Sequence, residues 1–174
     1  MMRDPLSRLS LRPSRAWRLR AAWFGALVAG TLDLGYAIYG TVSAGRAPLR
    51  MLQSIASGWQ GRAAYDGGLV SAALGVVSHY GILFVFAAAF VDACMRRPAL
   101  VQQPLRHGVL LGIAVYVLMQ AVIVPLSAAP FSLPHGLGDV VEGLLVHLCL
   151  VGLPIVYVAR YILGRVGWPP GFRR

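Results

Sequence analysis

Residues 68–91 read GLVSAALGVVSHYGILFVFAAAFV, and this stretch decides the fold. Its 24 residues include no Asp, Glu, Lys or Arg, and His79 is its single histidine. At about 1.5 Å per residue, a helix of this length crosses a hydrocarbon core about 30 Å thick. The stretch therefore predicts a transmembrane helix. Because an imidazole facing lipid is costly, we expect His79 to face other helices.

The composition of the whole chain also indicates a membrane protein. Of its 174 residues, 57% are hydrophobic and 13% are charged, which lies outside the range of soluble domains. The net charge of +10 comes from arginines that lie between apolar stretches. A nucleic-acid-binding face would need basic residues spread over a polar folded surface. We therefore expect the lipid bilayer as partner and no nucleic acid.

Four apolar stretches are long enough to cross a bilayer, and together they form one membrane domain over residues 21–163. The predicted spans are 21–40, 68–94, 105–126 and 138–163. Residues 1–20 are predicted to be a basic tail, and residues 164–174 a second tail. The predicted fold class is an all-α integral membrane four-helix bundle.

The arginines are distributed unequally about these spans. Thirteen lie on the side of the two termini and of the turn at Arg96, and three lie on the other side: Arg46, Arg50 and Arg62. Cytoplasmic loops carry an excess of basic residues, so both termini are expected in the cytoplasm.

The connection over residues 41–67 contains a helical pattern of its own. Pro48 can occupy the first position of a helix, and apolar residues follow it at helical spacing: Leu49, Leu52, Ile55, Ala56 and Trp59. The pattern predicts a short interfacial helix in this first external loop, with Arg50, Gln53 and Ser57 facing water. The alternative is an ordered loop without membrane contact.

Each predicted span places its small and polar residues on one face, which favours close helix packing around a polar interior. The first span does so around Gly30 and Asp33, and the second around Gly75 and His79. In the third span, four such residues follow one another at intervals of four: Gly108, Gly112, Tyr116 and Gln120. We predict one interior polar cluster formed by these side chains: Asp33, His79, Tyr116, Gln120, Glu142 and His147. Estimated depths from the helical rise place Asp33, His79 and His147 in the same half of the membrane.

Three functions are compatible with such an interior. The first is a non-enzymatic membrane protein whose polar groups serve packing, with a homo-oligomer or a partner subunit as further options. The second is a small transporter or proton-linked site built on Asp33, His79, Glu142 and His147, since buried ionisable groups are candidates for function. The third is a b-type haem protein with His79 and His147 as axial ligands.

No catalytic residue and no metal site is predicted, because the chain has no HExxH, GxSxG, P-loop or CxxC signature. The spacing of His135, Asp139 and Glu142 could hold a divalent cation. Capping of the fourth helix by the acids of Asp139-Val140-Val141-Glu142 is the favoured interpretation.

Several short motifs resemble those of small proteobacterial inner-membrane proteins. They are Ala29-Gly30-x2-Asp33, Leu52-Gln53-Ser54-Ile55-Ala56-Ser57-Gly58, Pro125-Leu126-Ser127-Ala128 and His147-x4-Gly152-Leu153-Pro154. The chain is also distantly similar to the YagU family of inner-membrane proteins, in His79, Pro125, the Pro130-Phe131-x2-Pro134 loop and His147. The resemblance covers most of residues 21–163. It implies a multi-pass protein of the bacterial inner membrane and assigns no reaction.

Overall fold

The computed structural model describes residues 12–130 and 136–169, and within them it contains helices and no strand. Four helical spans are long and apolar enough to cross a membrane, so the chain is a multi-pass membrane protein and the predicted all-α bundle is confirmed. The first two spans are the single helices α2 (Arg15–Ser43) and α4 (Gly68–Arg96). The third comprises α6 (Pro104–Leu118), η2 (Met119–Ile123) and α7 (Val124–Leu126). The fourth comprises α8 (Leu137–Val146), η3 (His147–Gly152) and α9 (Leu153–Gly164).

The observed spans agree with the predicted ones within two residues, except for the first, which begins six residues earlier and ends three residues later than predicted. Helix α2 begins at Arg15 rather than at residue 21. The predicted span began after the arginines because hydropathy locates the apolar part of a helix and not the residue at which the helix itself begins. A helix needs only its backbone hydrogen bonds and continues past the apolar region, with long arginine side chains able to reach water.

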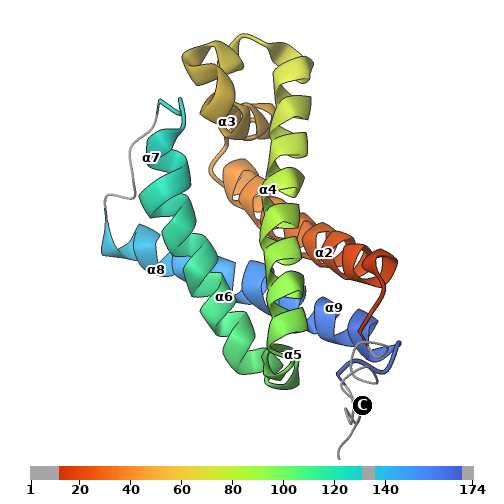
Figure 1. Cartoon of the computed structure of the whole chain (residues 1–174). Coiled ribbons are helices and arrows are strands. Elements are labelled where there is room, and N and C mark those ends of the chain that lie inside the picture. Colours follow the sequence, from red (N-terminus) through yellow and green to blue (C-terminus); the bar gives the residue numbers. More distant parts are fainter. Residues whose placement is uncertain (1–11, 131–135, 170–174) are drawn as a thin grey trace, which may run out of the picture.

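Helix α2 packs against α4 and α9, and the four helices cross obliquely (Figure 1). Small residues on one face of α2 are fully buried there: Ala21, Ala22, Ala26 and Ala29. Side chains such as Leu83, Ala87 and Ile155 meet them from α4 and α9. Beyond Asp33 the stripe stops packing, since a side chain at Gly40 would meet nothing within 4 Å.

The outer faces of the helices carry large apolar side chains. Trp23 and Phe24 on α2, and Val77 and Val85 on α4, are all more than half exposed. Contiguous exposed apolar surface of this kind is unfavourable in water. In a membrane, lipid chains cover this apolar surface, so its exposure agrees with four membrane spans.

Helix α6 and segment η3 cross with their backbones in contact. An added Cβ at Gly152 would overlap the Gly108 carbonyl oxygen and the Gly112 amide nitrogen. An added Cβ at Gly112 would lie 2.7 Å from the His147 carbonyl oxygen. The glycines predicted to form a packing stripe on the third span therefore do so, and their partner is the segment that begins at His147.

Segments η2 and η3 are π-helical, and each is followed two residues later by a proline, Pro125 or Pro154. Proline has no N–H and its ring collides with the carbonyl four residues earlier in an α-helix. A wider π turn before the proline relieves this conflict. These turns change which residues face inward in the third and fourth spans.

Between α2 and α4 lies α3 (Pro48–Gln60), followed by the 3₁₀ segment η1 (Gly61–Tyr65). The helix predicted after Pro48 is thus confirmed, and the loop alternative is wrong. Helix α3 packs along the first part of α4, where an added Cβ at Gly75 would overlap the Leu52 carbonyl oxygen. The backbone N–H of Ala128 donates a 2.9 Å hydrogen bond to the Gly58 carbonyl oxygen, which ties α3 to the end of the third span.

The orientation predicted for α3 is partly wrong. Arg50 is exposed as expected, but Gln53 and Ser57 are 2% and 0% exposed. Gln53 donates through Nε2 to the Gly68 carbonyl oxygen at 3.1 Å, and Ser57 donates through Oγ to the Ser54 carbonyl oxygen at 2.6 Å. These bonds satisfy the Gln53 amide nitrogen and the Ser57 hydroxyl, so the helix can bury the face that its polarity suggested was outside. The Gln53 Oε1 atom is also buried and has no hydrogen-bond partner among the described residues.

Candidate functional site

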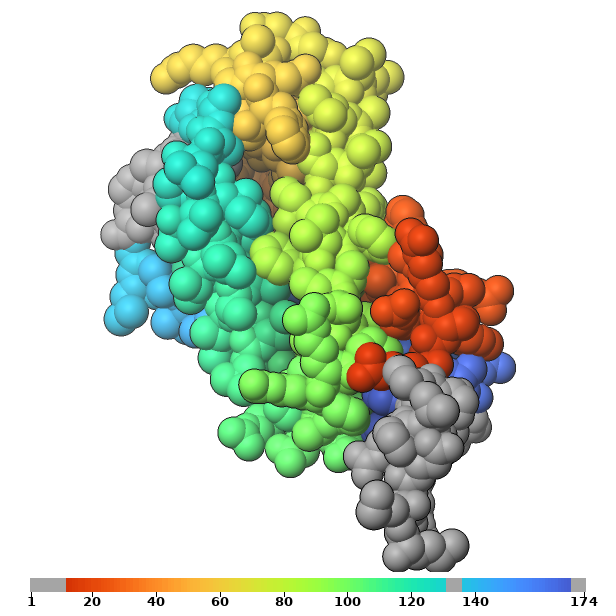
Figure 2. Space-filling view, viewed as in Figure 1, coloured from red at the N-terminus to blue at the C-terminus, as the bar shows by residue number. Residues whose placement is uncertain are grey.

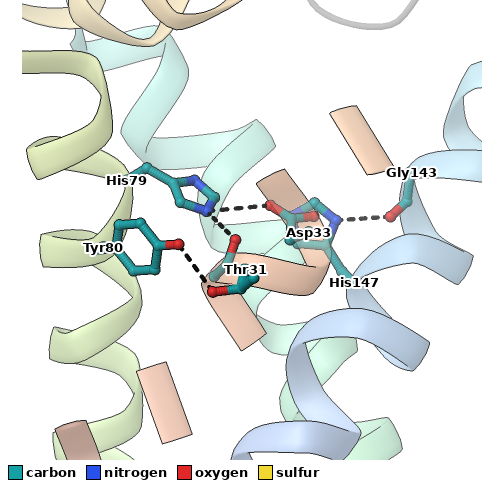
Figure 3. Close-up of polar contacts among 7 residues, drawn as sticks. Thr31, Asp33, His79, Tyr80, Gly143 and His147 are labelled. Carbon is teal, nitrogen blue, oxygen red and sulfur yellow. Dashed lines mark hydrogen bonds and ion pairs between the residues drawn. The ribbon is translucent and has the colours of Figure 1, made fainter. Parts of the chain in front are cut away.

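Asp33 of α2 and His79 of α4 face each other inside the bundle (Figure 3). The His79 Nε2 atom lies 3.8 Å from Asp33 Oδ2 and 3.1 Å from the Gly30 carbonyl oxygen. The His79 side chain is 12% exposed and the Asp33 side chain is 20% exposed. A carbonyl only accepts hydrogen bonds, so Nε2 carries a proton and donates it to Gly30. In this tautomer of the neutral ring, Nδ1 is the acceptor nitrogen.

The close approach of α2 and α4 at Gly30 fixes this geometry. An added Cβ at Gly30 would lie 2.6 Å from Tyr80 Cε1, so a larger residue would push α4 away. Tyr80 also forms a 3.0 Å hydrogen bond with Thr31 Oγ1 and meets the His79 ring edge-on at 5.5 Å between centroids. The glycine thus lets the two helices approach, and the tyrosine holds the imidazole in place.

His147 begins the π-helical segment of the fourth span. Its Nδ1 donates a 2.7 Å hydrogen bond to the Gly143 carbonyl oxygen one turn earlier (Figure 3). Tyr116 lies against the ring at 5.4 Å between centroids, and it occupies the space that a side chain at Gly143 would fill. Because Nδ1 carries the proton in the neutral ring, Nε2 remains an acceptor with no hydrogen-bond partner among the described residues.

Asp33, His79 and His147 line one cavity of about 120 Å³. Its other walls are apolar and come from α3 and the spans: Ile55, Ile82, Leu83, Val115, Met119 and Val151. A water molecule needs roughly 10–15 Å³ of such space and two or more polar partners. The cavity therefore has room for several water molecules among three titratable side chains.

Of the six side chains predicted to form the interior cluster, the structure brings four together. Asp33, His79 and His147 share the cavity, and Tyr116 contacts the His147 ring. Glu142 lies outside it: the side chain is exposed and accepts a 2.8 Å hydrogen bond from Tyr36 Oη. A single helical period placed Glu142 near the stripe, but it lies in α8, five residues before η3 begins, on the exposed side of the helix.

Gln120 is also not part of the cluster. It lies within η2 and forms no hydrogen bond with any residue that the structure describes. The prediction extended the spacing Gly108, Gly112, Tyr116 by four more residues. The π turn starting at Met119 breaks that period, and Met119 lines the cavity instead of Gln120.

The sequence did not indicate several parts of the site. Ile55 comes from α3, Thr31 lies two residues before Asp33, and Tyr80 directly follows His79. The signal available for Tyr80 was its place beside His79 on α4. No sequence pattern showed that α3 would contribute a wall.

The alternative cation site at the start of the fourth helix is not supported. His135 lies outside the described residues, and these contain no group of three His, Cys, Asp or Glu side chains that could hold a metal ion. The favoured capping by side chains is wrong in its detail. Helix α8 begins at Leu137 after Gly136, without a side-chain cap, and Asp139 lies in its first turn.

The shared cavity is a poor fit for haem. Its volume of about 120 Å³ is well below the roughly 300–1,000 Å³ of pockets that hold ligands of drug size. The Nε2 atom of His79 is also engaged with Gly30 rather than free to bind iron. Haem between these histidines would require the spans to separate, so the geometry disfavours this function.

No family model matches this chain, and no curated protein or solved structure is similar enough to match it.

Proposed function

We propose that this chain is a non-enzymatic protein of the bacterial inner membrane, related to YagU-like proteins, with a proton-linked site formed by Asp33, His79 and His147. The observation that supports the proposal is their convergence. Three titratable side chains from three different spans line one cavity of about 120 Å³. An ionisable group inside a membrane bundle is costly, and such groups mark ion or proton pathways when they occur together.

The hydrogen bonds give each imidazole a distinct role. His79 Nε2 donates to the Gly30 carbonyl oxygen and lies near Asp33, so Nδ1 is the acceptor nitrogen of the neutral ring. In His147 the arrangement is reversed, and Nε2 is the acceptor. A proton can then move between Asp33, His79 and His147 through water in the cavity. The two π segments contribute Met119, His147 and Val151 to its wall, and π turns are frequent at functional sites.

Proton movement through purified protein in liposomes tests this proposal. A potassium diffusion potential should drive protons into liposomes containing the wild-type protein, measured with an entrapped pH-sensitive dye. Asp33→Asn should reduce the rate to that of protein-free liposomes, because the neutral amide cannot bind the proton.

Asp92→Asn is the matched control, since Asp92 is exposed and paired with Arg96 at 2.9 Å outside the cavity. This variant should keep the wild-type rate. Equal rates for wild-type and Asp33→Asn protein would contradict a proton-linked site and assign the polar cavity to packing.

The orientation proposed for the protein places both termini in the cytoplasm, as the arginine distribution indicates. Alkaline phosphatase requires disulfides that form outside the cytoplasm, so its activity reports the side of a fusion. Fusions after Arg97 or Arg174 should be inactive, and a fusion within 127–137 should be active. High activity after Arg174 would overturn the orientation.

A further inference from the structure

A second, larger cavity of about 460 Å³ lies between α3, α4 and the η2–α7 end of the third span. Figure 2 shows the recess between the teal third span and the yellow-green α4, beneath α3. Ile55, Ile82 and Met119 line both this cavity and the smaller one, so they form the wall between the two. The volume lies in the range typical of small-molecule sites.

The lining of this cavity is apolar apart from a few neutral groups. Ile123, Val124 and Leu126 line the side formed by the third span, and no charged side chain among the described residues lines it. Ser78 lies ten residues after the start of α4, about 15 Å along the helix, so the cavity reaches into the second span. Its other end lies near the ends of α3 and of the third span, at Trp59 and Ala129.

Three serine hydroxyls line the cavity, and each has already donated its proton to the backbone of its own segment. Ser54 Oγ donates to the Met51 carbonyl oxygen at 2.6 Å. Ser78 and Ser127 donate to the carbonyl oxygens of Leu74 and Val124 at 2.7 and 2.8 Å. What these hydroxyls offer a ligand is thus mainly their acceptor lone pairs.

Two of those acceptors already have a donor. Ser78 Oγ accepts from Trp59 Nε1 at 2.9 Å, and Ser127 Oγ accepts from the Ala129 N–H at 3.2 Å. Ser54 Oγ accepts no hydrogen bond from any described residue, although Ser54 is only partly exposed. A ligand group that donates a hydrogen bond would satisfy it.

We propose that this cavity binds an uncharged amphiphile with a hydroxyl head group and a single hydrocarbon chain. The hydroxyl donates to Ser54 Oγ, and the chain lies along Ile123, Val124 and Leu126. A phosphate or carboxylate head group would bring only acceptors and a charge to a lining without cations, which carries a large desolvation cost. The inference does not depend on the proton-linked site.

A photoreactive monoacylglycerol with a diazirine in its acyl chain is the probe. With the protein in detergent micelles, the probe should label residues of α3 and η2–α7. An excess of unlabelled monoacylglycerol should reduce this labelling. A fatty acid probe with the same chain, whose ionised carboxylate only accepts hydrogen bonds, should label this region weakly. The proposal would be overturned if unlabelled monoacylglycerol failed to reduce the labelling, or if the carboxylate probe labelled the region equally.

A pair of adjacent alanines supplies the blocking variant and its control. Ala129 lines the cavity, whereas Ala128 is exposed and does not. Ala129→Trp should fill the space and remove the competable labelling, and Ala128→Trp should keep it. Equal labelling of the two variants would contradict the assigned site.

A second variant tests the head-group contact without filling the cavity. Ser54→Ala removes the acceptor, and one lost hydrogen bond corresponds to about two- to tenfold weaker binding of the monoacylglycerol. Labelling by a diazirine alkane of the same length should not change. If labelling by both probes fell equally in Ser54→Ala, Ser54 would affect only the shape of the cavity, which would contradict a preference for a hydroxyl head group.

Discussion

Gly152→Ala is expected to lower the free energy of unfolding by about 3 kcal/mol, the upper part of the usual range for overpacked sites. The added methyl group would overlap the backbone of Gly108 and Gly112 on α6. Backbone atoms cannot rotate away as a side chain can, so α6 and η3 would have to separate. Titration of the detergent-solubilised protein with dodecyl sulfate, followed by circular dichroism, measures the change.

Gly138→Ala is the control in the same span, because a Cβ there meets nothing within 4 Å. Alanine is favoured over glycine in a helix by up to about 1 kcal/mol, so this variant should be as stable as the wild type or slightly more stable. If Gly152→Ala unfolds like Gly138→Ala, the backbone contact between the third and fourth spans is not present. Because this contact also positions His147, the variant should lose proton movement as well.

Gly75→Ala is expected to release α3 from α4. Its methyl group would overlap the Leu52 carbonyl oxygen, and it would also crowd the Ala56 amide nitrogen at 3.4 Å. We expect a loss of about 2–3 kcal/mol, concentrated in the docking of α3 rather than in the spans. Hydrogen exchange should rise over 48–65 and stay unchanged in α2, and labelling of the larger cavity should fall.

Gly81→Ala on the same helix should have none of these effects, since no atom lies within 4 Å of a Cβ at that position. Both variants place alanine in the interior of α4, so the difference between them isolates the contact with α3. Unchanged exchange over 48–65 in Gly75→Ala would contradict the close docking of this helix.

The convergence of Asp33, His79 and His147 could be predicted from sequence because two independent arguments agree. Each lies on a face rich in small residues, and each is too costly to expose to hydrocarbon. The same reasoning failed for Gln120 and Glu142. Gln120 follows the third-span stripe only if the α-helical period continues, and the π turn at Met119–Ile123 ends that period.

Hydropathy and the distribution of glycine, alanine and charge determined the four spans, the helix after Pro48 and the inward faces of the first two spans. These properties depend on local periodicity and on the cost of polar groups in lipid, which single segments carry by themselves. The tertiary structure decided the partner of each face. The Gly75 face receives α3 instead of another span, and Gln53 is buried against the start of α4. Periodicity shows that a face must be covered, but the covering element depends on contacts between residues far apart in sequence.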